Sequence, residues 1–132
     1  MSRKKLNVQI KIPRGARVLL LEDSDNRIAW FKQRVSNLTL VQTADEAIEV
    51  IARSPQPFDI VFLDHDLGVL HADGTCPQGT GFQVAKYLAG RRYLGENVVI
   101  HSWNADGAAA MKDALYGAVA IPFGQFELTE VA

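Results

Sequence analysis

The chain has 132 residues and a formal net charge of −1, and its composition is 48% hydrophobic and 22% charged. These values indicate one globular domain with a hydrophobic core and exclude an intrinsically disordered chain. The charge balance gives no overall preference for nucleic acid or membranes, and no apolar run approaches the roughly 20 residues that a membrane helix needs.

Basic residues gather ahead of the first acidic residue, Glu22. They are Arg3, Lys4, Lys5, Lys11, Arg14 and Arg17. Such an arm either meets phosphate groups or is a solvated tail. Residues 6–12 alternate strictly between apolar and polar side chains, which predicts an additional strand. We therefore expect a basic arm or extra strand over residues 1–15, followed by a domain over residues 16–132.

The cysteine content and the N-terminal sequence bear on the cellular compartment. Cys76 is the sole cysteine, which excludes an intrachain disulfide and fits a reducing environment. The N-terminal stretch MSRKKLNVQ lacks the apolar segment of a secretory signal peptide. We expect a cytoplasmic protein.

From residue 18 onward, strand-like and helix-like segments alternate along the chain. Short apolar runs predict strands, and apolar residues repeated every three or four positions predict helices. The predicted strands cover residues 18–21, 38–41, 59–63, 98–100 and 118–121. The predicted helices cover residues 27–38, 43–54, 82–90 and 104–117, the second opening on a capping box and the fourth on an asparagine cap.

This alternation predicts the fold class. Strands separated by single helices pair in parallel with right-handed crossovers, and continuously apolar strands are buried on both faces. We expect an α/β fold with a doubly wound five-stranded parallel sheet in the order 2-1-3-4-5, counted from the strand at residues 18–21. Ligands bind such sheets beyond the carboxyl ends of the strands, where the strand order reverses between the first and third strands.

Polar residues follow the strands that flank this crevice. They are Glu22 and Asp23 after the first strand, Asp64, His65 and Asp66 after the third, and His101, Ser102 and Asn104 after the fourth. Three gathered carboxylates repel one another, and a divalent cation relieves the repulsion. Mg²⁺ or Mn²⁺ suits such a site, with Glu22, Asp23 and Asp64 as ligands and the backbone carbonyl of Asp66 completing the set. Alternatively, Glu22 or Asp23 caps the following helix.

The side chains after the fourth strand and the two histidines add further chemistry. His65 and His101 titrate near neutral pH, so one could act as a general acid and the other as a base. Each could instead hydrogen-bond a carbonyl. Ser102 could hold a phosphoryl oxygen. Trp103 could stack on a base or ring, or pack as a lid on the next helix.

At four positions the chain resembles the receiver domain of two-component systems, over about residues 16–123. The acidic pair Glu22-Asp23 follows the first strand, Asp64 ends the third and Ser102 ends the fourth. In receivers the acidic pair binds Mg²⁺, the aspartate accepts a phosphoryl group, and the hydroxyl contacts a phosphoryl oxygen. The resemblance implies the receiver fold and makes Asp64 the expected phosphorylation site.

Three departures set the chain apart from a typical receiver. Ile121 stands where receivers carry a lysine before the proline that follows the fifth strand, and Trp103 stands where they carry a small residue. Only ten residues follow Pro122, so we expect the usual last helix to be short or missing. The missing lysine normally pairs with the acyl phosphate, and its absence favours a divergent branch.

Longer strings carry a second, more specific resemblance. LDHDLG at residues 63–68, TG at residues 80–81 and HSWNADGAAAM at residues 101–111 are similar to the cyclic-phosphate-processing receiver domains. That resemblance implies processing of cyclic phosphates at the ends of nucleotides or nucleic acids. A metal held by Asp23 and Asp64 could polarise the oxygens of such a diester, while a histidine activates water or protonates the leaving alkoxide.

Three functions follow as hypotheses. The first is a metal-dependent phosphoesterase acting on cyclic phosphates of nucleotides or RNA ends. Its catalytic and phosphate-contacting candidates are Asp64, His65, His101, Ser102 and Asn104. The alternative is a stand-alone response-regulator receiver phosphorylated on Asp64, and the third hypothesis is a binding or scaffold protein without turnover. The expected partner is a phosphate-bearing small molecule or a nucleic-acid end, not a membrane.

The short C-terminal tail also has a structural consequence. Without a last helix, one face of the sheet near the first and fifth strands is under-covered. The extra strand at residues 6–12, together with Phe123 and Phe126, could cover this face. Otherwise the exposed apolar surface would favour a homodimer.

Overall fold

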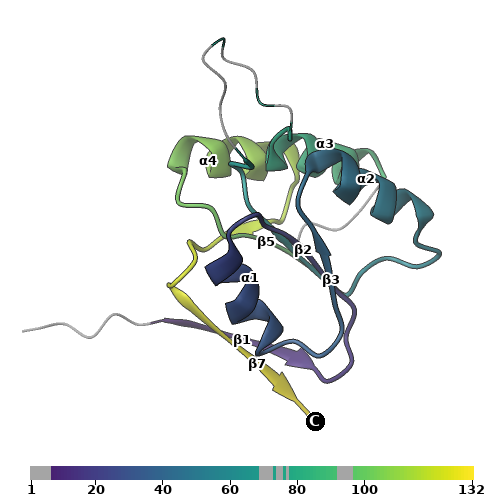
Figure 1. The fold of residues 1–132 in the computed structure, drawn as a ribbon, viewed down its shortest axis with the longest axis vertical. Coiled ribbons are helices and arrows are strands. Elements are labelled where there is room, and N and C mark those ends of the chain that lie inside the picture. Colours follow the sequence, from purple (N-terminus) through teal and green to yellow (C-terminus); the bar gives the residue numbers. More distant parts are fainter. Residues whose placement is uncertain (1–6, 69–72, 74–75, 77, 92–96) are drawn as a thin grey trace, which may run out of the picture.

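The computed structural model describes residues 7–68, 73, 76, 78–91 and 97–132 (Figure 1). The strands are β1 (Val8–Pro13), β2 (Val18–Leu21), β3 (Leu38–Val41), β4 (Ile60–Leu63), β5 (Val98–Ile100), β6 (Val119–Ala120) and β7 (Phe126–Val131). The helices are α1 (Asp25–Lys32), α2 (Ala44–Arg53), α3 (Gly81–Gly90) and α4 (Ala105–Ala114). Among the described helices, none is both long and apolar enough to cross a membrane.

The central sheet has five strands in the order β3-β2-β4-β5-β6, and every neighbouring pair is parallel. This order is the predicted 2-1-3-4-5, so the predicted doubly wound α/β fold is confirmed. All four residues of β2 are fully buried, because a hydrophobic cluster packs against each face of the sheet. Leu19 packs in one hydrophobic cluster and Leu20 in the other, as the alternation of side chains along a strand requires.

The two faces of the sheet are covered differently (Figure 1). Helices α2, α3 and α4 lie together on one face and form the larger hydrophobic cluster with it. On the other face lie α1 and a two-stranded parallel sheet made of β1 and β7. The small sheet therefore lies over the sheet face that the absent last helix would leave open.

Strand β1 confirms the predicted N-terminal strand. It pairs with β7 over its whole length, with Ile10 opposite Leu128 and Ile12 opposite Glu130. Ile12, Phe126 and Leu128 are buried in the cluster beneath, and Phe123 packs against it. The tail after Pro122 thus forms a strand in place of a helix. Since this face is covered within one chain, the stated reason for a homodimer falls away, and the oligomeric state stays a prediction.

The buried β1 residue gives a direct test of this covering sheet. Ile12→Ala is expected to lower the free energy of unfolding by about 2–4 kcal/mol, because it removes buried methyl groups and leaves a cavity. Urea denaturation measures the change. Gln9→Ala, at an exposed position of the same strand, is the control and should change stability by less than about 0.5 kcal/mol. Equal stability of both variants would show that β1 does not stabilise the core.

Several elements are shorter than the sequence patterns predict, most clearly α1, α4 and β6. Helix α1 ends at Lys32, not at residue 38. After it, the N–H and hydroxyl of Ser36 both donate to the Glu130 carboxylate on β7. Helix α4 ends at Ala114, and Gly117, with φ of 93°, forms the turn before β6. Strand β6 has only two residues, not the predicted four over residues 118–121.

Candidate functional site

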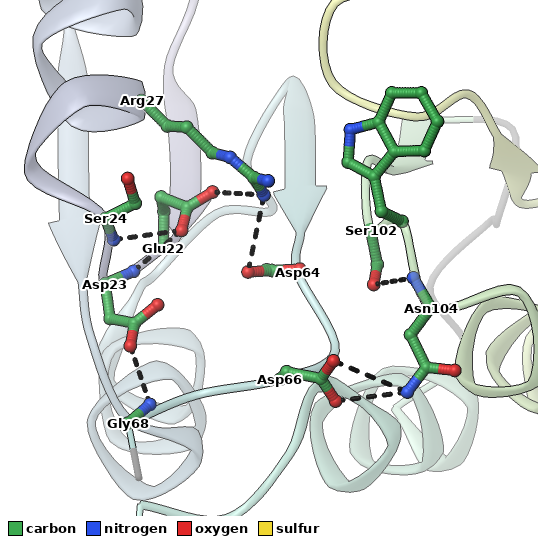
Figure 2. Close-up of a pocket in the computed structure, with 10 residues that line it drawn as sticks. Glu22, Asp23, Ser24, Arg27, Asp64, Asp66, Gly68, Ser102 and Asn104 are labelled. Atoms are coloured by element: carbon green, nitrogen blue, oxygen red, sulfur yellow. Dashed lines mark hydrogen bonds and ion pairs between the residues drawn. The ribbon is translucent and has the colours of Figure 1, made fainter.

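A polar hollow of about 300 Å³ opens at the carboxyl ends of β2, β4 and β5 (Figure 2). We call it the acidic hollow, because four carboxylates and one guanidinium line it. Its lining consists of Glu22, Asp23, Ser24, Arg27, Asp64, Asp66, Gly68, Ser102, Trp103 and Asn104. The predicted crevice between the first and third strands is therefore present, and it extends to the fourth.

The register of the sheet explains why Glu22, Asp64 and His101 meet. Leu21 pairs with Leu63, and Leu63 pairs with Ile100. The ladder continues one residue further, since the N–H of Asp64 donates to Leu21 and the N–H of His101 donates to Leu63. The next residue of each strand consequently lies in one row. One potential ligand atom from each of these three side chains lies within 4.8 Å of the others.

Asp64 is a buried carboxylate with little compensation. It is 5% exposed, and its Oδ1 accepts the N–H of His65 at 2.9 Å. Burial raises the pKa of Asp64 to about 6, and the negative charge of Glu22 acts in the same direction. The positive charges of His101 and Arg27 oppose this rise without cancelling it. A carboxylate in this situation is stabilised by an added cation.

Glu22 is buried completely and is held by several donors. Its Oε2 accepts the N–H groups of Asp23 and Ser24, each at 3.0 Å, and its Oε1 lies 2.9 Å from Nε2 of His101. Burial alone would raise the pKa of Glu22, but the hydrogen bond and charge of His101 and the N–H of Ser24 hold it below its usual range. Glu22 therefore keeps its negative charge, and it joins the end of β2 to the end of β5.

His101 lies behind the acidic hollow and does not line it. Its ring is fully buried and packs near Phe31 and Phe62, with centroid distances of 5.6 and 6.4 Å. Nδ1 has no hydrogen-bond partner among the described residues, whereas Nε2 faces Glu22. The predicted acid–base role of His101 stays a prediction.

Arg27 supplies the cation inside the hollow, and the sequence analysis did not identify it. Its Nη1 lies 3.6 Å from Oε1 of Glu22 and 3.9 Å from Oδ2 of Asp64 (Figure 2). The guanidinium also lies 5.2 Å from the centroid of the Phe123 ring. The sequence contained a signal for this role, because Arg27 follows the acidic pair within the first turn of the next helix. That turn must lie beside the crevice.

Asp66 and His65 form a second pair at the opposite side of the hollow. Oδ1 of Asp66 lies 2.8 Å from Nδ1 of His65 and accepts from Nδ2 of Asn104 at 3.1 Å. The hydrogen bond from His65 holds the pKa of Asp66 below its usual range, and Asn104 contributes. A Cβ at Gly107 would lie 2.5 Å from the His65 ring, so the glycine gives the ring its place. His65 does not line the hollow, and its predicted proton-transfer role stays a prediction.

Hydrogen bonds of Asn104, Ser102 and Asp23 connect the segments that surround the hollow. Asn104 caps α4 by accepting the N–H of Gly107 at 2.9 Å, and its own N–H donates to Oγ of Ser102 at 3.0 Å. Oδ2 of Asp23 accepts the N–H of Gly68 at 2.6 Å, which ties the end of β2 to the loop after β4. Six of the eight predicted residues thus line the acidic hollow. The other two, His65 and His101, do not line it but contact the carboxylates of Asp66 and Glu22.

The donor set fits a hard divalent cation. Asp23, Asp64 and Asp66 present carboxylate oxygens to one space, and these are the ligands that Mg²⁺ and Mn²⁺ prefer. Glu22 belongs to the group of three side chains whose potential ligand atoms lie within 4.8 Å of one another, and both of its oxygens also have hydrogen-bond partners. The residues present therefore fit the predicted metal, with Asp23 and Asp64 as the residues that would hold it.

Comparisons with solved structures support the same architecture. The signal receiver domain of a protein described as a Luxo repressor from Vibrio parahaemolyticus is 24% identical, with a TM-score of 0.59 over 83% of this chain and 78% of that chain. The non-phosphorylated HemR receiver domain from Leptospira biflexa is 23% identical, with a TM-score of 0.62 over 83% and 82%. Identities at this level show the shared fold alone.

A third solved structure carries a metal ion. The receiver domain of a sensor histidine kinase from Pseudomonas aeruginosa is 17% identical, with a TM-score of 0.60 over 83% of this chain and 86% of that chain. That protein has a magnesium ion coordinated in its active-site cleft. Comparison with curated proteins gives no match.

The sequence itself matches a family described as the cyclic-phosphate processing receiver domain, over residues 17–117. The matched span runs from β2 to the turn after α4, so it includes every residue that lines the acidic hollow. The chain therefore belongs to the cyclic-phosphate processing receiver domain family.

Proposed function

We propose that the protein is a metal-dependent phosphoesterase that opens cyclic phosphates of nucleotides or RNA ends. The observation that carries the proposal is the acidic hollow, where the incompletely compensated Asp64, the Arg27 guanidinium and the Ser102 hydroxyl face one space. Carboxylates there attract a divalent cation, while the guanidinium and hydroxyl are ligands for phosphate oxygens. A site of this kind suits an anionic diester.

Asp23 and Asp64 would hold Mg²⁺ or Mn²⁺, with the backbone carbonyl of Asp66 as a further ligand. An ion held there would supply Lewis acidity, which polarises a phosphoryl oxygen and makes water a stronger nucleophile. The magnesium ion in the receiver domain from Pseudomonas aeruginosa supports this assignment by analogy of fold.

The protein's own residues orient the diester and move protons. Arg27, already 3.9 Å from Asp64, binds a non-bridging oxygen and balances the charge of the entering phosphate. Ser102 contacts a second oxygen. Water adds to phosphorus, one ring P–O bond breaks, and the water proton reaches the leaving alkoxide, giving a phosphomonoester. Asp66, whose Oδ1 lies 2.8 Å from Nδ1 of His65, takes this proton from the water, and the Asp66–His65 pair returns it to the alkoxide.

His101 serves in this proposal as a positioning residue. It contacts Glu22 and does not line the hollow. By fixing Glu22, it sets the negative charge beside Asp64 and keeps Arg27 between the two carboxylates. This role replaces direct proton transfer by His101.

The alternative function is a stand-alone receiver phosphorylated on Asp64, and the receiver fold of the structural neighbours favours it. The C-terminal side of the site argues against it. Ile121, at the position of the receiver lysine, is half-buried and packs against the hydrophobic cluster beneath β1 and β7. No cation from this position reaches Asp64, so an acyl phosphate would lack its usual partner.

Parallel incubations of the purified protein distinguish these functions. With Mg²⁺ or Mn²⁺ present, we expect the protein to convert a 2′,3′-cyclic nucleotide to a nucleoside monophosphate, which ³¹P NMR detects. EDTA should stop the reaction. Acetyl phosphate with Mg²⁺ should leave the intact mass unchanged. A stable phosphoryl adduct without diester turnover would overturn the proposal in favour of the receiver. Binding of the nucleotide without product would identify a binding protein.

A further inference from the structure

A second hollow of about 370 Å³ lies next to the acidic hollow and has a different character. Its walls are mostly apolar, with the small residues of α4 on one side and the segment after β6 on the other. The residues that matter here are Trp103, Ala105, Ala108, Ala109, Lys112 and Pro122. Ser102 and Trp103 line both hollows, so the two are adjacent. We call this second space the apolar hollow.

Trp103 stands between the two hollows as a fixed but exposed ring. Its side chain is 57% exposed, although most large apolar residues of the chain are buried. Its Nε1–H donates to the carbonyl oxygen of Phe123 at 2.9 Å, which holds the indole in one orientation. The bond runs to the segment after β6, so Trp103 is not simply a lid on α4. A fixed, solvent-exposed aromatic face is a surface on which another flat ring can stack.

With the proposed divalent cation offsetting its carboxylates, the acidic hollow suits a phosphate, and the apolar hollow beside it suits a neutral ring. Carboxylates and Arg27 line the acidic hollow, whereas Lys112 is the charged residue of the apolar hollow. Ala105, Ala108 and Ala109 leave space that larger side chains would fill. A molecule that fits both spaces has a phosphate close to a flat, largely uncharged ring.

We propose that the apolar hollow binds the nucleobase of a nucleotide whose cyclic phosphate occupies the acidic hollow. This inference rests on the proposed phosphoesterase function and names its substrate class as nucleoside 2′,3′-cyclic phosphates. The walls are mostly alanine and proline, and only Ser102 and Lys112 among the lining side chains, besides the Trp103 N–H that Phe123 already binds, could hydrogen-bond a base edge, so stacking area dominates the selection. Purine nucleotides, which have the larger stacking area, are therefore preferred over pyrimidine nucleotides.

The test compares adenosine 2′,3′-cyclic phosphate with methyl riboside 2,3-cyclic phosphate, which keeps the sugar and the diester but has no base. The wild-type protein should favour the nucleotide about tenfold or more in kcat/KM, mainly through KM, because base stacking on an aromatic ring has that magnitude. Trp103→Ala and Ala109→Leu should each reduce this ratio toward one. Trp103→Phe should retain part of it. Tyr116→Ala removes a fully exposed aromatic residue that lines neither hollow and should keep the wild-type ratio.

The outcomes separate the subsite from the proposed function. Equal turnover of both substrates by the wild type would overturn the base-binding subsite and leave the phosphoesterase intact. If neither substrate is turned over, the proposed function fails, and calorimetric binding of the same two compounds decides the subsite. Tenfold tighter binding of the nucleotide that is lost in Ala109→Leu supports the subsite. Equal or absent binding overturns it.

Discussion

Replacing Asp64 with asparagine is expected to abolish turnover of a 2′,3′-cyclic nucleotide and yet to stabilise the metal-free protein. The activity loss should be at least about 10²–10³-fold, which is typical when one charged contact to the transition state is removed. The stability gain follows from burial, because an ionised carboxylate that is 5% exposed costs free energy that a neutral amide of the same shape does not.

The pH dependence of this gain has a defined sign. The pKa of Asp64 is about 6 in the folded protein, against an ordinary value of 3.8. The folded state therefore binds the proton more tightly than the unfolded state, so wild-type stability falls as pH rises from about 4 to 6. Above pH 6 the full penalty applies, about 1–3 kcal/mol. Asp64→Asn removes this fall.

Urea denaturation without metal at pH 5 and pH 7.5 measures the effect. Wild type and Asp64→Asn should differ more at pH 7.5 than at pH 5. Asp113→Asn, at an exposed position of α4, is the matched control and should follow the wild type in stability and turnover. An Asp64→Asn variant that is less stable than the wild type at pH 7.5, or that retains turnover, would contradict this account of the site.

The second large effect concerns the buried contact between Glu22 and His101. Glu22→Ala is expected to lower the free energy of unfolding by about 3–5 kcal/mol, because it leaves a buried imidazole without its partner. Two backbone N–H groups, of Asp23 and Ser24, also lose their acceptor. Glu22→Gln keeps the shape and should cost less. Chemical denaturation at pH 7 measures each change.

Glu22 also predicts acid sensitivity of the opposite sign to that of Asp64. Its pKa lies below the ordinary value of 4.5 in the folded protein, so its stabilisation is present above pH 4.5 and is lost as pH falls through the folded pKa. Glu22→Gln should remove this loss. Glu49→Ala is the control, because Glu49 and Arg53 form an exposed ion pair at 2.7 Å whose removal costs about 0.3–0.5 kcal/mol. Equal costs for Glu22→Ala and Glu49→Ala would refute the importance of the buried contact.

Local patterns in the sequence predicted most of the fold. The apolar runs at residues 18–21, 38–41 and 98–100 match β2, β3 and β5 in both bounds. The alternation at residues 6–12 predicted β1, although not its partner. The helix after Pro122 was expected to be short or missing, but the pairing of this tail with β1 depends on contacts across most of the chain, which no local pattern encodes.

The sequence predicted which strand ends form the candidate site, but not how each side chain is oriented there. Parallel register brings Glu22 and Asp64 together, and topology alone predicts that. The direction of each side chain beyond the strand end is set by packing. His101 therefore turns toward Phe31 and Phe62 and away from the hollow. Arg27 was missed although its place in the first turn of α1 was a signal, while its distances to Glu22 and Asp64 depend on how α1 packs on the sheet.

Calorimetric titration of Mg²⁺ and Mn²⁺ into the metal-free protein tests the central claim most directly. The account predicts saturable binding at one site in the wild type and in Asp113→Asn, and its loss in Asp64→Asn. Flat titrations for both ions with folded wild-type protein, or equal binding by Asp64→Asn, would contradict a divalent-cation site in the acidic hollow.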